Sequence, residues 1–153
     1  MCPGPRYPRG VPPLIGLLVA IAVLALATVA GLMIKRRNGR FRVVQDTPDP
    51  LLDGLGIQRG TPLTLLQFSS AFCAPCRTTR VLCADVAAKI DGVRHVEVDA
   101  EAHLDAVRAL DIWRTPTVLM IDAQGKIRRR ATGAPTRAQL LAAVGDLLPA
   151  GTA

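Results

Sequence analysis

The sequence predicts an α/β fold in which a central mixed β-sheet is flanked by helices and preceded by one N-terminal transmembrane helix. Two observations carry this prediction. A run of 21 residues, Leu14 to Ile34, has no charged side chain, and strand-like and helix-like segments alternate after residue 60. Such alternation is typical of a sheet covered by helices on both faces. The expected organisation is therefore a tail (1–13), a transmembrane helix (14–34), a basic flank and linker (35–60) and a folded domain (61–153).

The uncharged run has the length and composition of a membrane span. At a rise of 1.5 Å per residue it extends about 31 Å, close to the thickness of a bilayer's hydrocarbon core. It is apolar on every face over a length that a buried helix of a globular domain rarely reaches. A signal peptide is the alternative, with Arg6 and Arg9 as its basic start and residues 25–27 (Ala-Leu-Ala) as a cleavage-like site.

Basic residues on the two sides of this run predict its orientation. Two precede it, whereas five follow it: Lys35, Arg36, Arg37, Arg40 and Arg42. Because basic flanks tend to stay in the cytoplasm, we expect the folded domain on the cytoplasmic face. The opposite arrangement, with the domain outside the cytoplasm, is the alternative.

The net charge of +7 does not predict binding to nucleic acid. Much of it lies in the flank, where basic residues anchor a helix end at anionic headgroups. A second cluster, residues 128–130, would be split between the faces of a strand, and no aromatic residues alternate with it to stack on bases. We therefore expect a membrane partner and no nucleic-acid partner.

Periodicity and turn residues predict the elements of the folded domain. An edge strand is expected at 41–45, and central strands at 63–68 and 93–99. The hairpin spans 118–127. Helices are expected from about Pro75 to Ile90, from Ala102 to Leu110 and from Thr136 to Leu148, with Thr136 as the N-cap of the last. The first of these helices has an apolar stripe of Leu82, Cys83, Val86, Ala87 and Ile90.

Cys73-Ala74-Pro75-Cys76 stands where the first central strand gives way to a helix. Proline is tolerated in the first turn of a helix, where backbone N–H groups have no partner. Unpaired N–H groups and the helix dipole favour a thiolate there. Two thiols at this spacing can close a disulfide. We therefore predict Cys73 as the nucleophile and Cys76 as the resolving thiol.

The cysteines also admit other interpretations. Half of a zinc site needs two more ligands, and the remaining Cys2, Cys83, His95 and His103 are not paired at ligand spacing, so no metal is expected. Cys83 lies on the apolar stripe and is expected in the core, with a regulatory thiol as the alternative. Cys2 lies in the tail and has no assigned role.

The region from Thr61 to Gly145 resembles the thioredoxin family. The resemblance rests on residues 68–77 around the cysteines, the strand 93–99, the sequence Arg114-Thr115-Pro116-Thr117, the hairpin and Gly133. It implies a cis peptide bond before Pro116, with the Thr115 backbone free to pair with an extended substrate. It also implies substrate contacts at Ala74 and Pro75, and no cofactor.

Several positions depart from the family pattern. Thioredoxins generally carry a buried aspartate where this chain has Gln67, near a lysine where it has His95. This pair is thought to move the proton of the resolving thiol. Glutamine cannot act as a base, so proton transfer would pass through water, His95 or another route, although His95 also fits a purely structural strand histidine. Ser69 and Phe72 stand where the family usually has tryptophan.

The sequence thus predicts a membrane-tethered thiol–disulfide oxidoreductase that acts as a reductase of disulfide-containing proteins or small thiol substrates. The Ala-Pro pair between the cysteines is closer to the Gly-Pro of reducing thioredoxins than to the Pro-His of strong oxidants. The electron donor would be a thioredoxin-reductase-like protein or a membrane carrier. The alternatives are a scaffold that holds a membrane partner, an extracytoplasmic oxidoreductase, and a carrier of sulfur or metal.

Overall fold

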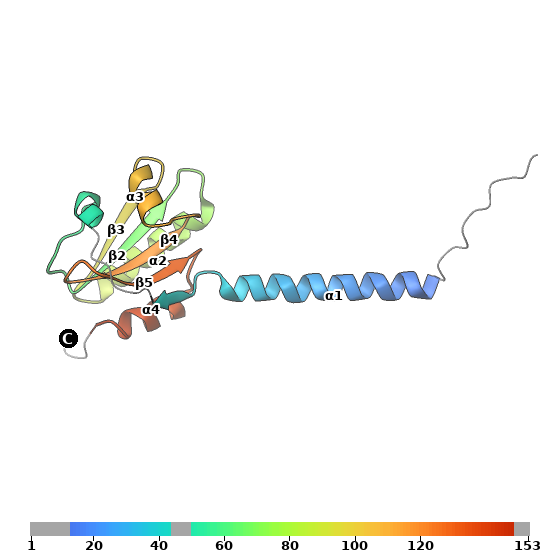
Figure 1. Cartoon of the computed structure of the whole chain (residues 1–153). Helices are drawn as coiled ribbons and strands as arrows, with labels where there is room; N and C mark the ends of the chain where they lie inside the picture. Colours follow the sequence, from blue (N-terminus) through green and yellow to red (C-terminus); the bar gives the residue numbers. More distant parts are fainter. Residues whose placement is uncertain (1–12, 44–49, 149–153) are drawn as a thin grey trace, which may run out of the picture. The chain divides into compact units, whose positions relative to one another are not determined.

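The computed structural model describes residues 13–43 and 50–148 (Figure 1). Cys2, Arg6 and Arg9, and the last two residues of the predicted first strand, lie outside the described residues. The chain divides into two compact units, Met1–Arg37 and Asn38–Ala153.

The first unit contains one helix, α1 (Pro13–Arg37). Its segment Leu14–Lys35 is long and apolar enough to cross a membrane, and none of that segment is buried against protein. Such a surface needs an apolar environment, because a helix that is hydrophobic on all sides has no polar face for water. Its length and composition fit a membrane span, and its position near the N-terminus also fits a signal sequence.

The second unit is built on a five-stranded mixed sheet with the order β1-β5-β4-β2-β3. The strands are β1 (Phe41–Val43), β2 (Leu63–Ser69), β3 (Val93–Asp99), β4 (Thr117–Asp122) and β5 (Ile127–Thr132). The β2–β3 pair is parallel, and the other three pairs are antiparallel. All seven residues of β2 are buried, because this strand is central and covered on both faces.

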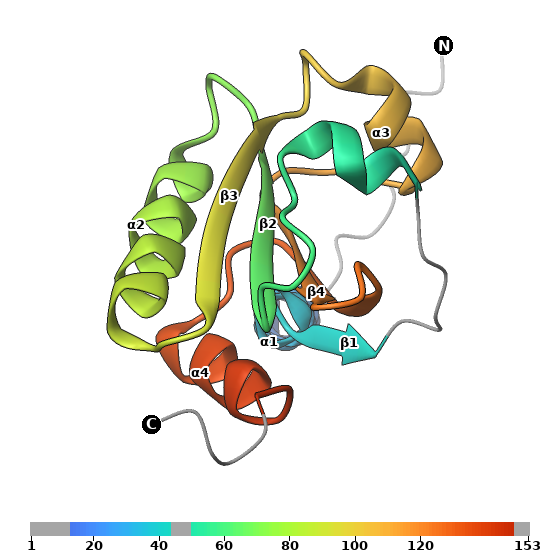
Figure 2. The same ribbon diagram turned by 90° about the vertical axis from the view of Figure 1, so that its left-hand side faces the viewer.

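Helices cover both faces of this sheet, as the alternation of strand and helix predicted (Figure 2). Helices α2 (Ala74–Lys89) and α4 (Arg137–Gly145) share one apolar cluster with Leu63 and Leu65. Helix α3 (Leu104–Ala109) and the 3₁₀ helix η1 (Pro50–Leu55) share the other with Leu66 and Phe68. Successive β2 side chains thus serve opposite cores.

Several predicted elements differ from the observed ones. The helix predicted at 102–110 is shorter, because an Asp99 carboxylate oxygen accepts from the Glu101 backbone N–H at 2.9 Å and a turn precedes α3. The last helix ends at Gly145 rather than Leu148. Its predicted N-cap is confirmed, since the Thr136 side chain and Gln139 form a capping box.

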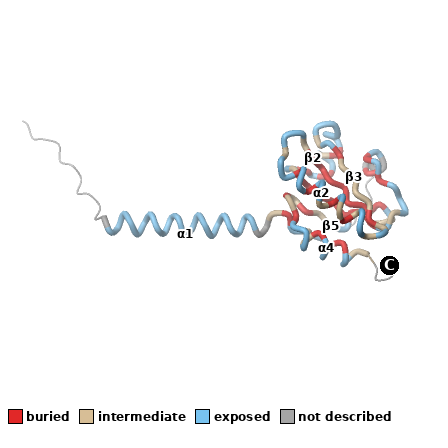
Figure 3. Tube along the Cα trace, turned by 180° about the vertical axis from the view of Figure 1, so that it is seen from behind, coloured by how far each residue is buried: buried red, intermediate tan, exposed pale blue. Residues whose placement is uncertain are grey.

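Residues 50–57, which the sequence placed in a linker, pack against the sheet. Leu52, Leu55 and Ile57 are buried in the cluster that also holds Phe68. Figure 3 shows buried residues, in red, within the folded unit, whereas α1 is exposed from Leu14 to Lys35. The apolar side chains of η1 therefore complete one face of the core, and this segment belongs to the folded unit.

Candidate redox site

The CxxC motif lies where β2 leads into α2, at the carboxyl end of the central strand. Cys73 is the N-cap of α2, and its Sγ accepts a hydrogen bond from the backbone N–H of Cys76 at 3.1 Å. Ala74 and Pro75 form the first turn, where a missing proline N–H costs nothing because these groups have no intrahelical partner. The helix therefore begins one residue earlier than the sequence predicted.

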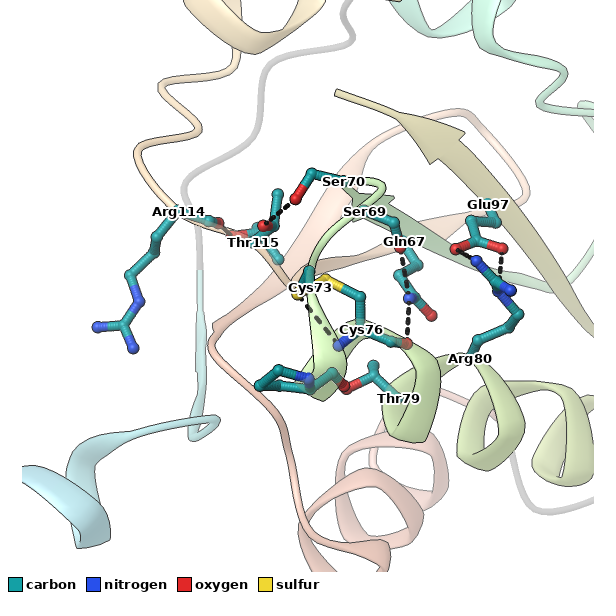
Figure 4. Close-up of a disulfide and its surroundings, with 12 residues drawn as sticks. Gln67, Ser69, Ser70, Cys73, Cys76, Thr79, Arg80, Glu97, Arg114 and Thr115 are labelled. Carbon is teal, nitrogen blue, oxygen red and sulfur yellow. Dashed lines mark hydrogen bonds and ion pairs between the residues drawn. A yellow bond between two sulfur atoms is a disulfide. The ribbon is translucent and has the colours of Figure 1, made fainter. Parts of the chain in front are cut away.

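Cys73 and Cys76 form a disulfide with an S–S distance of 2.03 Å and a Cα–Cα distance of 5.2 Å (Figure 4). The two residues differ in exposure. Cys73 is half-buried, whereas Cys76 is 1 % exposed and belongs to the buried side of α2. An incoming thiol or disulfide can therefore reach the sulfur of Cys73 more readily than that of Cys76.

The loop that precedes β4 lies beside the motif. The Thr115–Pro116 peptide bond is cis, and the Thr115 hydroxyl lies 3.2 Å from the Ser70 hydroxyl, in the turn before Cys73. A backbone hydrogen bond fixes this loop, because the Gly133 N–H donates to the Pro116 carbonyl at 2.7 Å. The structure thus places Thr115 and Pro116 beside the turn that leads to the cysteine motif.

A buried polar network contacts the first turn of α2. Gln67 is fully buried, and its Nε2 donates to the Ser69 hydroxyl at 2.7 Å and to the Cys76 carbonyl at 3.0 Å. Its Oε1 lies 3.2 Å from Nε2 of His95. Because an amide oxygen only accepts, this bond places the His95 proton on Nε2. These hydrogen bonds connect His95 to the Cys76 carbonyl through Gln67.

A pocket of about 390 Å³ opens beside the disulfide. It is lined by Cys73, Cys76 and a set of polar residues that includes Ser69, Arg77, Arg80, Glu97 and Asp99. Glu97 accepts from Nη2 of Arg80 at 2.7 Å, and a second contact joins Arg80 Nε to the same carboxylate. Burial opposes ionisation of Glu97, but hydrogen bonds from Arg80 and Ser69 hold its pKa below the usual value.

The sequence reading did not find Arg80 and Glu97. A signal for Glu97 is the pairing of the two parallel strands: in the observed register, Glu97 lies opposite Gln67 and therefore close to the cysteine motif. Arg80 lies one helical turn after Cys76, so its side chain falls on the same side of α2.

Comparison with known proteins places this site in a family. The family model described as Thioredoxin matches residues 56–146. The chain belongs to the thioredoxin family. With its CxxC pair at disulfide distance, it is a thiol–disulfide oxidoreductase. A comparison with curated protein sequences found no match.

Solved structures show the same fold. A thioredoxin pre-protein from Schistosoma mansoni, in its reduced form, is 25 % identical with a TM-score of 0.55, and the match covers 65 % of this chain and 92 % of that one. A thioredoxin from Nicotiana alata is 24 % identical with a TM-score of 0.53, over 57 % and 75 % of the two chains. A Fasciola hepatica thioredoxin is 22 % identical with a TM-score of 0.52, over 63 % and 88 %.

His103 and Cys83 are further candidate ligands that lie within the described part of this thioredoxin-family domain. The described ranges 13–43 and 50–148 contain no cluster of three or more metal-ligating side chains. Nδ1 of His103 lies 3.1 Å from the Asp99 carbonyl, at the start of α3. Cys83 is fully buried, and burial, followed by the Glu97 charge, raises its pKa to about 12.

Replacing Gln67 with leucine tests the buried network. The change leaves the Cys76 carbonyl, the Ser69 hydroxyl and the His95 ring without their shared partner. We expect a loss of about 1–3 kcal/mol in unfolding free energy, the cost of unsatisfied buried polar groups. Urea denaturation measures it. Gln58, which is exposed, provides the matched control, and an equal loss in Gln58→Leu would contradict this account.

His95 is expected to make folding stability depend on pH. Burial lowers its pKa in the folded chain below the usual value near 6.5, so folding disfavours the protonated ring. Its contribution is therefore complete above the unfolded pKa and is lost as the pH falls through the lower, folded pKa. NMR titration of the ring should give a midpoint below 6.5. A midpoint at or above 6.5 would show that Gln67 and burial do not hold the neutral form.

Proposed function

We propose that this protein is a membrane-tethered disulfide reductase in which Cys73 attacks the substrate and Cys76 resolves the intermediate. The observation that carries the proposal is the position of Cys73 as N-cap of α2, with the Cys76 N–H directed at its Sγ. When the disulfide is reduced, that N–H and the helix dipole favour a thiolate at Cys73. Cys76 is nearly inaccessible to a substrate, which suits it to an intramolecular second step.

The reaction proceeds by two thiol–disulfide exchanges. The Cys73 thiolate attacks one sulfur of a substrate disulfide, the substrate S–S bond breaks, and a mixed disulfide forms as the other substrate sulfur leaves as a thiolate. Cys76 then loses its proton and attacks Sγ of Cys73. The substrate leaves with both sulfurs reduced, and the Cys73–Cys76 bond re-forms. The two electrons that enter the substrate must be restored by a dithiol donor.

Thr115 and Pro116, together with Ala74 and Pro75, are proposed to hold the substrate. Ala74 and Pro75 are exposed beside the disulfide. Within the described residues, no backbone hydrogen bond engages the N–H or carbonyl of Thr115 outside the regular elements. An extended peptide can therefore pair with this backbone and present its cysteine to Cys73.

Proton transfer from Cys76 is proposed to use water from the adjoining pocket. The Gln67 amide contacts the Cys76 carbonyl rather than its sulfur, and amides do not accept protons at neutral pH. His95 is separated from Cys76 by Gln67. Both residues then act by fixing the first turn of α2, while the pocket that Cys76 lines admits the water.

The reduction potential tests the direction of electron flow. Reducing thioredoxins have reduction potentials of about −270 mV, whereas strongly oxidising thiol–disulfide proteins have potentials of about −120 mV. We expect a value near the reducing end for the Cys73–Cys76 couple, measured by equilibration with a dithiol buffer of known potential. A value near the oxidising end would replace the reductase with an oxidase or isomerase.

The tether and its orientation have a separate test. We expect the full chain to float with vesicles and to resist extraction at high pH. In a Cys2→Ser, Cys83→Ser background, an impermeant maleimide should label Cys73 of the reduced protein only after cells are permeabilised, because the basic flank favours a cytoplasmic domain. Labelling in intact cells would place the domain outside and require a membrane electron carrier. If the mature chain isolated from cells lacks the helix, the helix is a signal peptide.

A further inference from the structure

The first residue of the folded unit lies beside the cis-proline loop. Asn38 directly follows the last residue of α1, and its Oδ1 accepts from Nη2 of Arg114, the residue before Thr115, at 2.7 Å. Asn38 also packs on Gly133, where an added Cβ would collide with the asparagine side chain. Gly133 in turn donates to the carbonyl of Pro116. The chain therefore enters the domain next to the substrate loop.

The register of the sheet leads to the same placement. The Gly39 N–H donates to the Thr132 carbonyl at 2.9 Å. Thr132 pairs with Thr117, and Thr117 pairs with Phe68 near the carboxyl end of β2. The turn to Cys73 starts one residue beyond Phe68, at the end of β2. The entry point and the disulfide thus lie at the same end of the sheet, a relation that belongs to the folded unit alone.

Two large aromatic side chains are exposed at this end. Phe72, which precedes Cys73, is 98 % exposed, and Trp113, which precedes Arg114, is 86 % exposed. Aromatic rings are favoured where an apolar environment meets water. We call Phe72 and Trp113 the aromatic rim. Phe72 directly precedes Cys73, and Trp113 lies two residues before Thr115, so both belong to the loops that border the disulfide.

We propose that the redox site works at the membrane surface, on disulfides of integral membrane proteins that lie at the boundary of the bilayer. This inference rests on the proposed tether and on the short chain distance between α1 and the substrate loop. Arg37 and Asn38 are adjacent, with Cα atoms about 3.8 Å apart. In the proposed tether, Lys35 and its basic neighbours lie at the headgroups, and Asn38 follows Lys35 by only three residues, so a short stretch of chain joins the bilayer surface to the substrate loop.

The occupant of the aromatic rim is proposed to be the apolar segment beside such a disulfide. A membrane protein has apolar and aromatic side chains where its spans reach the surface, which suits Phe72 and Trp113. The chemistry is the exchange described above: the partner S–S bond is reduced to two thiols, the Cys73–Cys76 bond forms, and a dithiol donor restores it.

The proposal is tested on the full chain by comparing the reduction rates of two disulfides at different distances from the membrane. The protein is reconstituted in phosphatidylcholine–phosphatidylglycerol vesicles with a single-span peptide whose disulfide loop directly follows its apolar segment. A second peptide has the same loop displaced by a Gly/Ser spacer of about 20 residues, about 25 Å in mean extent. We expect the adjacent disulfide to be reduced at least tenfold faster. Inserting an equal Gly/Ser spacer between Arg37 and Asn38 should bring the two rates together.

The controls separate this inference from the proposed function. Flotation with the vesicles verifies the tether, and reduction of soluble insulin, at equal rates with and without the inserted spacer, verifies fold and chemistry. If both hold and the uninserted protein reduces the two peptides equally fast, the membrane-surface inference fails while the reductase stands. Failure of flotation or of insulin reduction would instead overturn the proposed function on which it rests.

Trp113 provides a second readout, because it is the single tryptophan of the chain. We expect its emission to shift to the blue when the peptide with the adjacent disulfide is added to a Cys73→Ser variant in vesicles. Strong quenching of Trp113 by headgroup-labelled lipid before peptide is added, unchanged afterwards, would mean that the aromatic rim binds lipid. That result would overturn the assignment of a protein partner.

Discussion

Replacing Cys73 with serine is expected to abolish disulfide reduction, down to the rate of the uncatalysed thiol reaction. The serine hydroxyl can accept the same hydrogen bond from the Cys76 N–H, so the N-cap and the fold should persist. It cannot form a mixed disulfide, and Cys76, at 1 % exposure, cannot replace it as the attacking group. Insulin reduction with dithiothreitol as donor measures the loss.

Cys83→Ser is the matched control for that experiment. Cys83 is fully buried, and its raised pKa of about 12 keeps it as an unreactive thiol at neutral pH. The control should keep most of the activity of the unmodified chain, provided that it folds. Appreciable turnover by Cys73→Ser would show that Cys76 or Cys83 can start the reaction, contrary to the proposed roles.

Replacing Phe68 with alanine is expected to have the largest effect on stability. Phe68 is fully buried in the core cluster that joins β2 to η1 and α3. Truncating such a side chain costs about 3–5 kcal/mol, because the lost contacts leave a cavity that the surroundings fill only in part. Whole domains are stable by about 5–15 kcal/mol, so the loss is a large share of the total.

Unfolding of this variant can be followed through Cys83, which is protected in the native fold. The extent of Cys83 alkylation at increasing urea concentrations measures unfolding of the folded unit, and it is independent of the state of α1. Phe72→Ala provides a matched control, because Phe72 is 98 % exposed and its loss should change stability by no more than about 0.5 kcal/mol. Equal midpoints for the two variants would contradict the assigned core.

The position of the CxxC motif at the start of a helix could be predicted because its sequence signals are local. The strand at 93–99 was predicted with the observed bounds, and β2 is one residue longer than expected. A proline in the first turn and an apolar strand before it are sufficient to place Cys73 at a helix start. The cis bond at Thr115–Pro116 was implied only by the family resemblance, since most bonds before proline are trans.

The polar surroundings of the disulfide depend on tertiary contacts and could not be predicted in the same way. The sequence flagged Gln67 and His95 as departures, but not that Gln67 bonds to the Cys76 carbonyl and to His95 at once. The Arg80–Glu97 pair joins α2 to β3 and needs the strand register. The partner of β1 is likewise non-local: an edge strand was expected, and its pairing with β5 is what brings Asn38 to the cis-proline loop.

Trapping of substrates by a Cys76→Ser variant tests the central claim most directly. In this variant the Cys73 thiolate can still attack, but no second thiol is placed to release the substrate. We expect covalent complexes that disappear on reduction and are absent from the Cys73→Ser, Cys76→Ser double variant, with mass spectrometry locating the bond at Cys73. If Cys76→Ser traps no partner while Cys73→Ser still retains one without a covalent bond, the domain is a binding module and the reductase proposal is wrong.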